Sequence, residues 1–466
     1  MTIDQRTAAI FDNLEPWIVG QRWYGDKSRI SRRVTPEAIA AIEIDGADIG
    51  LIHVTLEFTD DSTSVYFVPL VIGEAGQPVD ALSDPRFLAW LGSGFDQSRV
   101  VRAGYGGGSR LVWTLANSVL GASWSREPSR VLGGEQSNTS IVFGDSAIAK
   151  VFRKLRPGIN PDSEIVSHLS ALSQFPHVPV FLGAIVLEFD DGRESIELAA
   201  VQALVPNQGD CWRWLPNALS EASESQLTEL LSAIQLLGQR TGELHVALAA
   251  SDSNDAFRPV PIDQEFLNAL EERIGREVRH TCSMLHSQGA CSHGESEALA
   301  ASLLGDVART EALMGTHQTR VHGDYHLGQV LRTHDDFSII DFEGEPSRSM
   351  TERREKTSPL KDVAGMLRSI DYAVATANAN EDGSTDDYLN LKTWRENAER
   401  SFVVGYLGAV GTSEPSLVPL EPGAFRQSLD LFMIEKALYE VRYELDNRPD
   451  WVDIPLGALQ RIAGST

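Results

Sequence analysis

The chain has 466 residues, of which 42% are hydrophobic and 23% charged, so its composition is that of a globular protein of about two or three domains and excludes a disordered chain. Its 40 basic and 66 acidic side chains give a formal net charge of −26, which disfavours binding to nucleic acid. No apolar run approaches the ~20 residues of a membrane span, and no signal-peptide core follows the N-terminus. We expect a cytoplasmic protein that binds neither nucleic acid nor membrane.

Residues 1–90 predict a small β-rich module with helical flanks. Apolar and polar residues alternate over 38–44, 51–58 and 64–71, which is typical of antiparallel strands exposed on one face. Asp and Gly residues between these runs suit hairpin turns. We expect these strands, with Trp23, to pack on the following β subdomain and to limit the motion of its glycine-rich turn.

The next segment predicts strands around that glycine-rich turn, residues 133–140. Its small side chains leave backbone N–H groups available to cradle phosphates, although an ordinary hairpin turn has the same composition. Lys150 then stands alone as a cation in a run of strand residues. The expected elements are strands at 130–132, 141–143, 147–152, 178–187 and 196–205, and a helix at 161–174.

Beyond Pro206 the pattern becomes helical. Apolar residues recur with the helical period in five long stretches, which predicts a helical second half. We therefore divide the chain into a cap subdomain (1–90), an intermediate β-rich subdomain (91–206) and a helical lobe (207–466). The expected helices lie near 225–250, 262–286, 295–315, 360–378 and 425–446.

The segments His322-Gly323-Asp324 and Asp341-Phe342-Glu343 carry the most informative chemistry. Their two aspartates flank a short apolar hairpin, and Asp341 follows a run of strand residues. Phosphoryl transfer needs this combination, because one carboxylate orients the attacking hydroxyl while another holds magnesium against the nucleotide phosphates. A zinc site at His322 and His326 is the competing interpretation, but Gly323 disfavours the helix that it requires.

These motifs resemble the catalytic loop and metal-binding motif of the aminoglycoside-phosphotransferase and protein-kinase-like superfamily. The resemblance implies an α+β, bilobal kinase-like fold, with Asp324 as the catalytic base and Asp341 as the principal metal ligand. Gln329 stands where the family usually has Asn, and Glu343 replaces the usual Gly. The resemblance leaves both as candidate metal ligands beside Asp341.

The same resemblance assigns nucleotide contacts to the first half of the chain, with ATP and Mg²⁺ as cofactors. Lys150 resembles the kinase lysine that contacts the phosphates, and Glu164 on the following helix would be its partner. The strand before Pro206 would be the hinge whose backbone contacts adenine. The expected ATP-binding residues are Lys150, Glu164, Gln136, Ser137, Asn138, Thr139, Gln202, Ala203 and Val205.

Further blocks resemble one branch of that superfamily, the bacterial maltokinases, over nearly the whole chain. This resemblance implies an N-terminal cap and ATP-dependent phosphorylation of maltose at its anomeric hydroxyl, which gives maltose 1-phosphate for α-glucan synthesis. It also implies a functional link to trehalose synthase, and we expect a monomer. The matching blocks are 21–24, 134–140, 157–161, 322–331, 341–346 and 358–369.

The expected acceptor face lies on the helix near 425–446. Lys436, Tyr439 and Tyr443 follow one stripe of that helix, and an ammonium group beside flat aromatic rings suits a sugar. By spacing alone, a buried helix face with two hydrogen-bonded tyrosine hydroxyls is the favoured interpretation. In maltokinases the corresponding Lys-x-x-Tyr-x-x-x-Tyr face contacts the disaccharide, so the resemblance implies substrate contacts for these three residues, Arg448 and Asp324.

Two alternatives remain open. Actinobacterial glucosamine kinases look similar in the cap, the catalytic loop and the metal motif, and an amino sugar would need a carboxylate for its ammonium group. Glu435, Glu440 and Glu444 are available on the same helix. The departures at Gln329 and Glu343 also allow a pseudokinase that serves as a binding scaffold.

Overall fold

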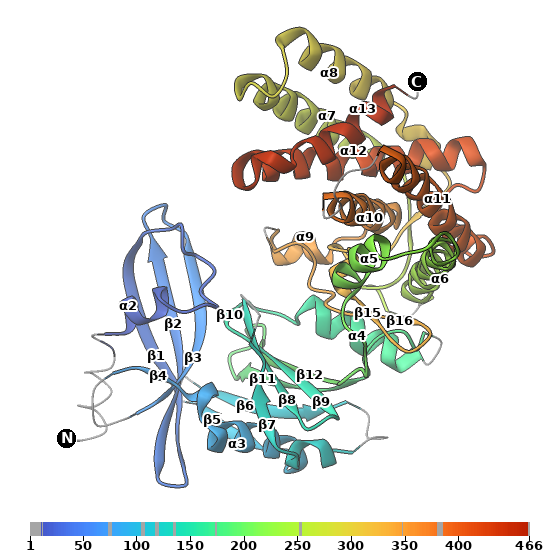
Figure 1. Cartoon of the computed structure of the whole chain (residues 1–466). Coiled ribbons are helices and arrows are strands. Elements are labelled where there is room, and N and C mark those ends of the chain that lie inside the picture. Colours follow the sequence, from blue (N-terminus) through green and yellow to red (C-terminus); the bar gives the residue numbers. More distant parts are fainter. Residues whose placement is uncertain are drawn as a thin grey trace. The chain divides into compact units, whose positions relative to one another are not determined.

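The chain is described by a computed structural model, which covers residues 11, 13–72, 77–103, 108–116, 121–133, 137–172, 175–250, 254–346, 348–379 and 385–464. The chain divides into two compact units (Figure 1). Unit 1 comprises Met1–Ser170 and Pro179–Val205, and unit 2 comprises Ala171–Val178 and Pro206–Thr466. The division into three parts at residues 90 and 206 stays a prediction.

The first sheet of unit 1 contains the three strands that the alternating pattern predicts. They run antiparallel in the order β1-β2-β3, and two short strands, β4 and β10, pair with β3. Asp45 and Gly46, both with positive φ, form the tight turn between β1 and β2. The strands are β1 (Ser31–Ile44), β2 (Ala47–Phe58), β3 (Thr63–Val71), β4 (Val79–Asp80) and β10 (Lys154–Leu155).

The second sheet of unit 1 has seven antiparallel strands in the order β5-β6-β11-β12-β9-β8-β7. It contains every strand that the sequence predicts between residues 130 and 205, with shifted ends. The helices of this unit include α2 (Leu14–Val19), α3 (Pro85–Asp96) and α4 (Pro161–Leu172). The strands are β5 (Val100–Ala103), β6 (Ser109–Leu115), β7 (Ser129–Val131), β8 (Asn138–Phe143), β9 (Ala147–Phe152), β11 (Phe181–Phe189) and β12 (Ile196–Ala203).

One apolar cluster joins the two sheets of unit 1. It includes Phe67 of β3, Phe87 of α3 and Leu198 of β12, all of them buried. Helix α3 packs closely here, because a Cβ on Gly94 would lie 2.4 Å from Nε1 of Trp113. The predicted packing of the cap strands on the β subdomain is therefore confirmed.

Arg153 is the polar counterpart of this apolar junction. Its side chain is 1% exposed, and its Nε donates a hydrogen bond to the hydroxyl of Thr139 in β8 at 2.8 Å. The other end of the guanidinium pairs with Asp80 of β4 and lies 4.6 Å from the ring centroid of Trp23. The Arg153 carbonyl also accepts the N–H of Phe67 at 2.7 Å. Arg153 thus connects the cap sheet to the strand that follows the glycine-rich turn.

Replacing Arg153 with Met should lower the free energy of unfolding by about 3 kcal/mol, because Asp80 would keep its charge without the partner that neutralises it. Chemical denaturation would measure this loss. Arg33→Met is the matched control, since Arg33 is an exposed cap residue. If both variants unfolded at the same denaturant concentration, Arg153 would contribute nothing specific to the junction.

Unit 2 is mainly helical, as the sequence predicts. α6 and α11 pack closely, because a Cβ on Gly238 would lie 2.0 Å from the Phe402 carbonyl oxygen and one on Gly405 would lie 1.9 Å from that of Gln235. The helices are α5 (Cys211–Ser220), α6 (Glu224–Leu248), α7 (Gln264–Ser287), α8 (His293–Val307), α9 (Met350–Arg354), α10 (Leu360–Ala379), α11 (Thr385–Val410), α12 (Pro422–Asn447) and α13 (Asp453–Ala463).

One predicted helix is wrong in its extent. The expected helix at 295–315 ends at Val307, and a separate 3₁₀ turn, η4 (Thr310–Leu313), follows. Val307 and Leu313 are both buried, but six residues of a continuous α-helix would turn Leu313 about a third of a turn away from Val307. The break lets both side chains reach the core. The predictions give no residue range for α3, α5, α9, α11 or α13.

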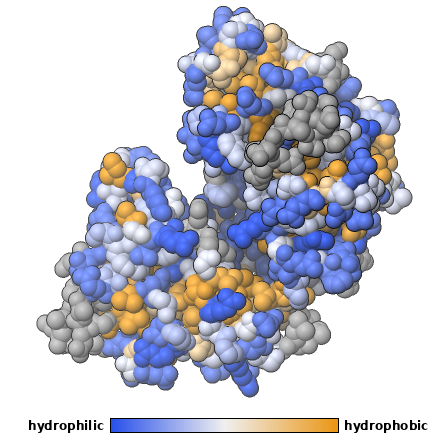
Figure 2. Space-filling model, in the orientation of Figure 1, coloured by the Kyte–Doolittle hydropathy of each residue, from blue (hydrophilic) through white to orange (hydrophobic). Residues whose placement is uncertain are grey.

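Hydropathy varies over the face of the molecule that Figure 2 shows. Figure 2 shows hydrophilic residues over much of the visible face, together with an apolar patch over the seven-stranded sheet of unit 1. Across the residue ranges given above, no helix combines the length and the apolarity that crossing a membrane requires.

Candidate active site

The loop that carries Asp324 is held by a buried carboxylate. Asp362, 1% exposed in the first turn of α10, accepts the backbone N–H groups of His322 at 2.7 Å and of Gly323 at 3.0 Å. Its Oδ2 also lies 3.1 Å from Nε2 of His245. Burial by itself raises the pKa of Asp362. Its bonds to His245 and Gly323 and the charge of His322 lower this pKa by a larger amount, so the net shift is downward. The backbone on which Asp324 sits is therefore fixed, while its own side chain is partly exposed.

Both histidines of the loop make local hydrogen bonds. His322 donates from Nε2 to the Ile340 carbonyl at 2.9 Å, and Nδ1 of His326 accepts the N–H of Gly328 at 3.0 Å. Burial lowers the pKa of the His326 imidazole, which favours its neutral form. These bonds agree with a structural role for both rings.

Asp341 follows the hairpin of β15 (Val330–Arg332) and β16 (Phe337–Ile339), as the apolar pattern predicts. It has a positive φ of 68°, an uncommon conformation for an aspartate, and Nε2 of Gln329 donates to its Oδ2 at 2.9 Å. The structure thus brings Gln329 and Asp341 together. Glu343 lies two residues further on and is half-buried.

The residues present fit magnesium only as part of a larger ligand set. Within the described ranges, no group of three or more His, Cys, Asp or Glu side chains could hold a metal ion. Mg²⁺ is commonly held by one or two carboxylates together with water and substrate phosphates. Asp341 offers one such carboxylate, and the amide oxygen of Gln329 beside it is a further candidate ligand, so both metal roles stay predictions.

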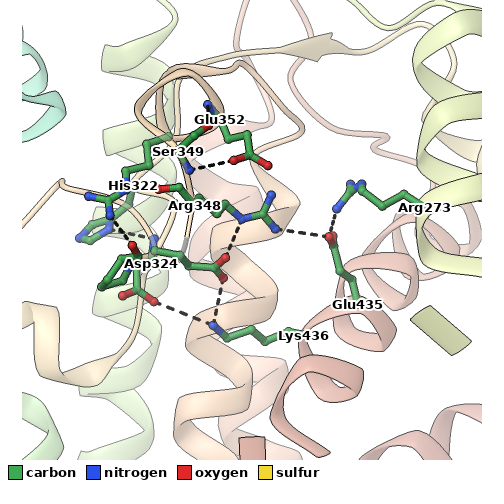
Figure 3. A network of polar contacts seen from close by, with 12 residues as sticks. Arg273, His322, Asp324, Arg348, Ser349, Glu352, Glu435 and Lys436 are labelled. Carbon is green, nitrogen blue, oxygen red and sulfur yellow. Dashed lines mark hydrogen bonds and ion pairs between the residues drawn. The ribbon is translucent and has the colours of Figure 1, made fainter. Parts of the chain in front are cut away.

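Asp324 lines a pocket of about 320 Å³ that lies wholly within unit 2. This volume falls within the ~300–1,000 Å³ that is usual for small-molecule sites. Lys436 of α12 lies 3.9 Å from Oδ1 of Asp324 and 3.5 Å from Oε1 of Glu345 (Figure 3). Burial by itself lowers the pKa of Lys436. The charges of Glu345 and Asp324 raise this pKa by a larger amount, so the ammonium group stays charged.

The predicted acceptor face is only partly within this pocket. Tyr439 lines it, and the Lys436 ammonium lies 5.3 Å from the Tyr439 ring centroid. Tyr443 stacks on Tyr439 at 6.4 Å, and both rings are about two-fifths exposed, but Tyr443 is not part of the pocket lining. Arg448 is also outside it and bonds to the buried Glu444 at 2.7 Å. The structure therefore joins Asp324, Lys436 and Tyr439.

The sequence analysis missed a series of alternating charges in the same pocket. Arg273 of α7 pairs with Glu435, whose carboxylate lies 3.9 Å from Arg348 (Figure 3). Arg348 in turn bonds to Glu345 at 2.7 Å. The sequence contains a signal for Glu345, which lies in the block 341–346, but none for Arg273, which is distant along the chain.

The residues predicted to hold the phosphates lie in unit 1. Gln136 lies outside the described residues, and Ser137 is exposed. Asn138 and Thr139 begin β8 with buried side chains, and the Thr139 hydroxyl is occupied by Arg153. The hydroxyl only accepts in this bond and keeps its own O–H donor, so the phosphate contact of Thr139 stays a prediction.

Lys150 lies on β9, in register with Ser140 of β8 and Ala200 of β12. Glu164 lies in the first turn of α4, as the resemblance requires. Both side chains are half-buried. Their pairing stays a prediction.

The predicted hinge lies at the end of β12. The N–H of Ala203 donates to Val180 at 2.8 Å, and the N–H of Leu204 donates to Ser146 at 2.9 Å. The Gln202 side chain donates to Asp162 of α4 at 2.9 Å. Two backbone donors of the hinge are therefore already used, and the contact of adenine with Val205 stays a prediction.

Comparison with known proteins gives two different signals. A family model described as the maltokinase N-terminal cap domain matches residues 17–104. Glucosamine kinase from Streptacidiphilus jiangxiensis is 28% identical over 333 residues, which cover 69% of this chain and 70% of that protein. Glucosamine kinase from Mycolicibacterium smegmatis is 26% identical over 352 residues, which cover 73% and 81%.

Solved structures of glucosamine kinase share the fold. One, in complex with glucosamine, ADP and inorganic phosphate, covers 96% of both chains at a TM-score of 0.69 and 22% identity. Another crystal form gives a TM-score of 0.71 at 22% identity and covers 96% of this chain and 97% of that one. The chain has the bilobal aminoglycoside-phosphotransferase-like fold with an N-terminal cap, which confirms the predicted fold class.

Proposed function

We propose that the chain is an ATP-dependent sugar kinase. The observation that carries this proposal is the position of Asp324, on a rigidly held loop at the wall of a pocket of about 320 Å³ that also contains Lys436 and Tyr439. A carboxylate can orient a hydroxyl, and the cation and ring beside it suit the polar rim and the apolar face of a sugar. The glucosamine kinases similar to this chain are enzymes of the same class.

In the proposed reaction, Asp324 accepts a hydrogen bond from one sugar hydroxyl. That oxygen forms a bond to the γ-phosphorus, the bond between this phosphorus and the β,γ-bridging oxygen breaks, ADP leaves, and Asp324 takes the hydroxyl proton. The ammonium group of Lys436 lies 3.9 Å from Asp324, where its charge attracts the carboxylate and helps to hold it in place. Positioning and charge neutralisation supply most of the rate enhancement in such reactions.

For the nucleotide we propose the residues that the resemblance indicates. Lys150 and the backbone near Ser137 would contact the phosphates, Glu164 would orient Lys150, and Val205 would contact adenine. Asp341 and Gln329, with Glu343 as a third ligand, would hold Mg²⁺, which would neutralise charge on the phosphates.

The comparisons favour glucosamine over maltose as the acceptor. Two curated relatives, matched over 69% and 73% of this chain, are glucosamine kinases, whereas the family model of the maltokinase cap matches residues 17–104. Glu345 and Glu435 line the pocket, and an ammonium group would compete for them with Arg273, Arg348 and Lys436, which already pair with them. Maltose is retained as the second candidate, because Lys436 and Tyr439 of the expected maltose face lie beside Asp324.

A coupled ADP-release assay with ATP and Mg²⁺, offering glucosamine and maltose separately at equal concentrations, would test the proposal. We expect turnover with glucosamine. Turnover with maltose alone would make the chain a maltokinase and would keep the role of Asp324. If neither sugar nor a wider sugar panel supported turnover, the kinase proposal would be wrong and a scaffold would replace it.

A further inference from the structure

Lys361 is a cation without a direct partner in the pocket wall. It lies in the first turn of α10, where the helix dipole adds to its positive potential, and its side chain is half-buried. Within the described part of the chain, the Lys361 ammonium group makes no hydrogen bond and no ion pair, and only the backbone N–H of this residue is bonded, to Ser358. Lys361 lines the same pocket as Asp324. An ammonium group has three donors, and a ligand in the pocket could accept hydrogen bonds from those of Lys361.

The charges around Lys361 do not compensate for the effect of burial on the pKa of its ammonium group. Burial lowers the pKa of its ammonium group, and Arg348 and Arg273 lower it further, while Glu345 and Asp362 raise it. The net shift is downward, so its neighbours do not fully stabilise the charged form. Burial likewise lowers the pKa of Arg273 to about 10, with Arg348 contributing.

The carboxylates of this wall are already engaged. Glu435 is shared by Arg273 and Arg348, and Glu345 is shared by Arg348 and Lys436. Asp362 is occupied by His245 and by the loop backbone. The pocket lining contains six cations and five carboxylates, in a chain whose net charge is −26. Arg442 pairs with Glu277, and Arg276 pairs with Glu272 outside the lining. Apart from these pairs and Asp362, the lining cations Arg273, Arg348, Lys361 and Lys436 stand against the carboxylates Asp324, Glu345 and Glu435.

We propose that Lys361, with Arg273 and Arg348, forms a subsite for an anionic group within the pocket. The ligand would be a phosphate or a carboxylate. Its oxygens would accept hydrogen bonds from the Lys361 ammonium group, and its negative charge would lie among the three cations. The identity of the anion rests on the proposed function, because both of its expected sources belong to the sugar kinase reaction. The anion is either the phosphoryl group of the phosphosugar product or an acidic substituent on the acceptor sugar.

The first test uses inorganic phosphate as the probe. Isothermal titration of phosphate into the full chain, saturated with a non-hydrolysable ATP analogue and Mg²⁺, should detect one bound ion outside the nucleotide site. Lys361→Met should weaken this binding about tenfold or more, because a charge-assisted hydrogen bond is lost. Lys361→Arg should retain it. Lys392→Met is the matched control and should bind like the wild type, because Lys392 is exposed on α11.

A second measurement does not depend on the folding of the variants. Phosphate should protect Lys361 of the wild-type chain from acetic anhydride, as measured by mass spectrometry, and should leave the acetylation of Lys392 unchanged. The subsite is refuted if the wild type binds no phosphate, if Lys361→Met binds it as tightly as Lys392→Met, or if Lys361 is not protected.

The failure of this inference and that of the proposed function are distinguishable, because phosphate binding needs no turnover. Phosphate binding through Lys361 without phosphorylation of any sugar would refute the kinase and keep the subsite. Sugar phosphorylation with phosphate binding insensitive to Lys361→Met would refute the subsite alone.

Two kinetic comparisons separate the sources of the anion. If product phosphate is the ligand, Lys361→Met should relieve competitive inhibition by the phosphosugar. If an acidic substituent is the ligand, the same substitution should raise KM for glucuronate but not for glucose. If neither changed, the subsite would have no part in the reaction and the inference would fail.

Discussion

Replacing Asp324 with Asn should lower kcat by about 10²- to 10⁴-fold and leave the affinity for ATP nearly unchanged. Asparagine keeps the size of the side chain but cannot take the hydroxyl proton. The loop backbone should stay in place, because Asp362 binds the N–H groups of His322 and Gly323 and not the Asp324 side chain. Steady-state kinetics together with equilibrium binding of ATP would measure both effects.

The matched control for this prediction is Asp335→Asn. Asp335 is 87% exposed in the β15–β16 hairpin, so its charge can be removed without touching the pocket. The control should turn over like the wild type. Wild-type-like turnover in Asp324→Asn would remove Asp324 from the role of base, and a parallel loss of ATP affinity would indicate that the substitution had disturbed the loop.

Replacing Asp362 with Ala should cost about 3–5 kcal/mol of unfolding free energy at neutral pH. The side chain is buried and accepts the N–H groups of His322 and Gly323 as well as contacting His245, and alanine would leave all three without their acceptor. Urea denaturation would measure the loss. Turnover should fall as well, because the loop that positions Asp324 would lose its anchor.

The effect of Asp362 on stability should depend on pH in a defined direction. Its pKa in the folded chain is lowered, so it stabilises the fold above the unfolded value of about 3.9 and loses this contribution as the pH falls through the folded pKa. The difference between wild type and Asp362→Ala should therefore shrink under acid conditions. Asp450→Ala is the control, because Asp450 is exposed. The prediction is wrong if the difference in stability between wild type and Asp362→Ala stays constant with pH. It is also wrong if Asp362→Ala and Asp450→Ala are equally stable.

Much of the secondary structure could be predicted because its signals are local. The alternation over 38–71 and the turn at Asp45 and Gly46 specify a hairpin without reference to the rest of the chain. Helix α11 was missed although it is 26 residues long, and its close packing on α6 depends on Gly238 and Gly405. Such packing is a property of two distant segments and has no local pattern.

The sequence by itself determined the acidic pair Asp324 and Asp341, the hairpin between them and the fold class, because each of these depends on short segments or on a resemblance along the chain. Only the tertiary structure decided which residues share the pocket. It placed Lys436 beside Asp324, left Tyr443 and Arg448 outside, and added Arg273, Arg348 and Lys361 from other elements. The physical reason is that ion pairing and burial depend on distances between side chains, which helix packing sets and sequence spacing does not encode.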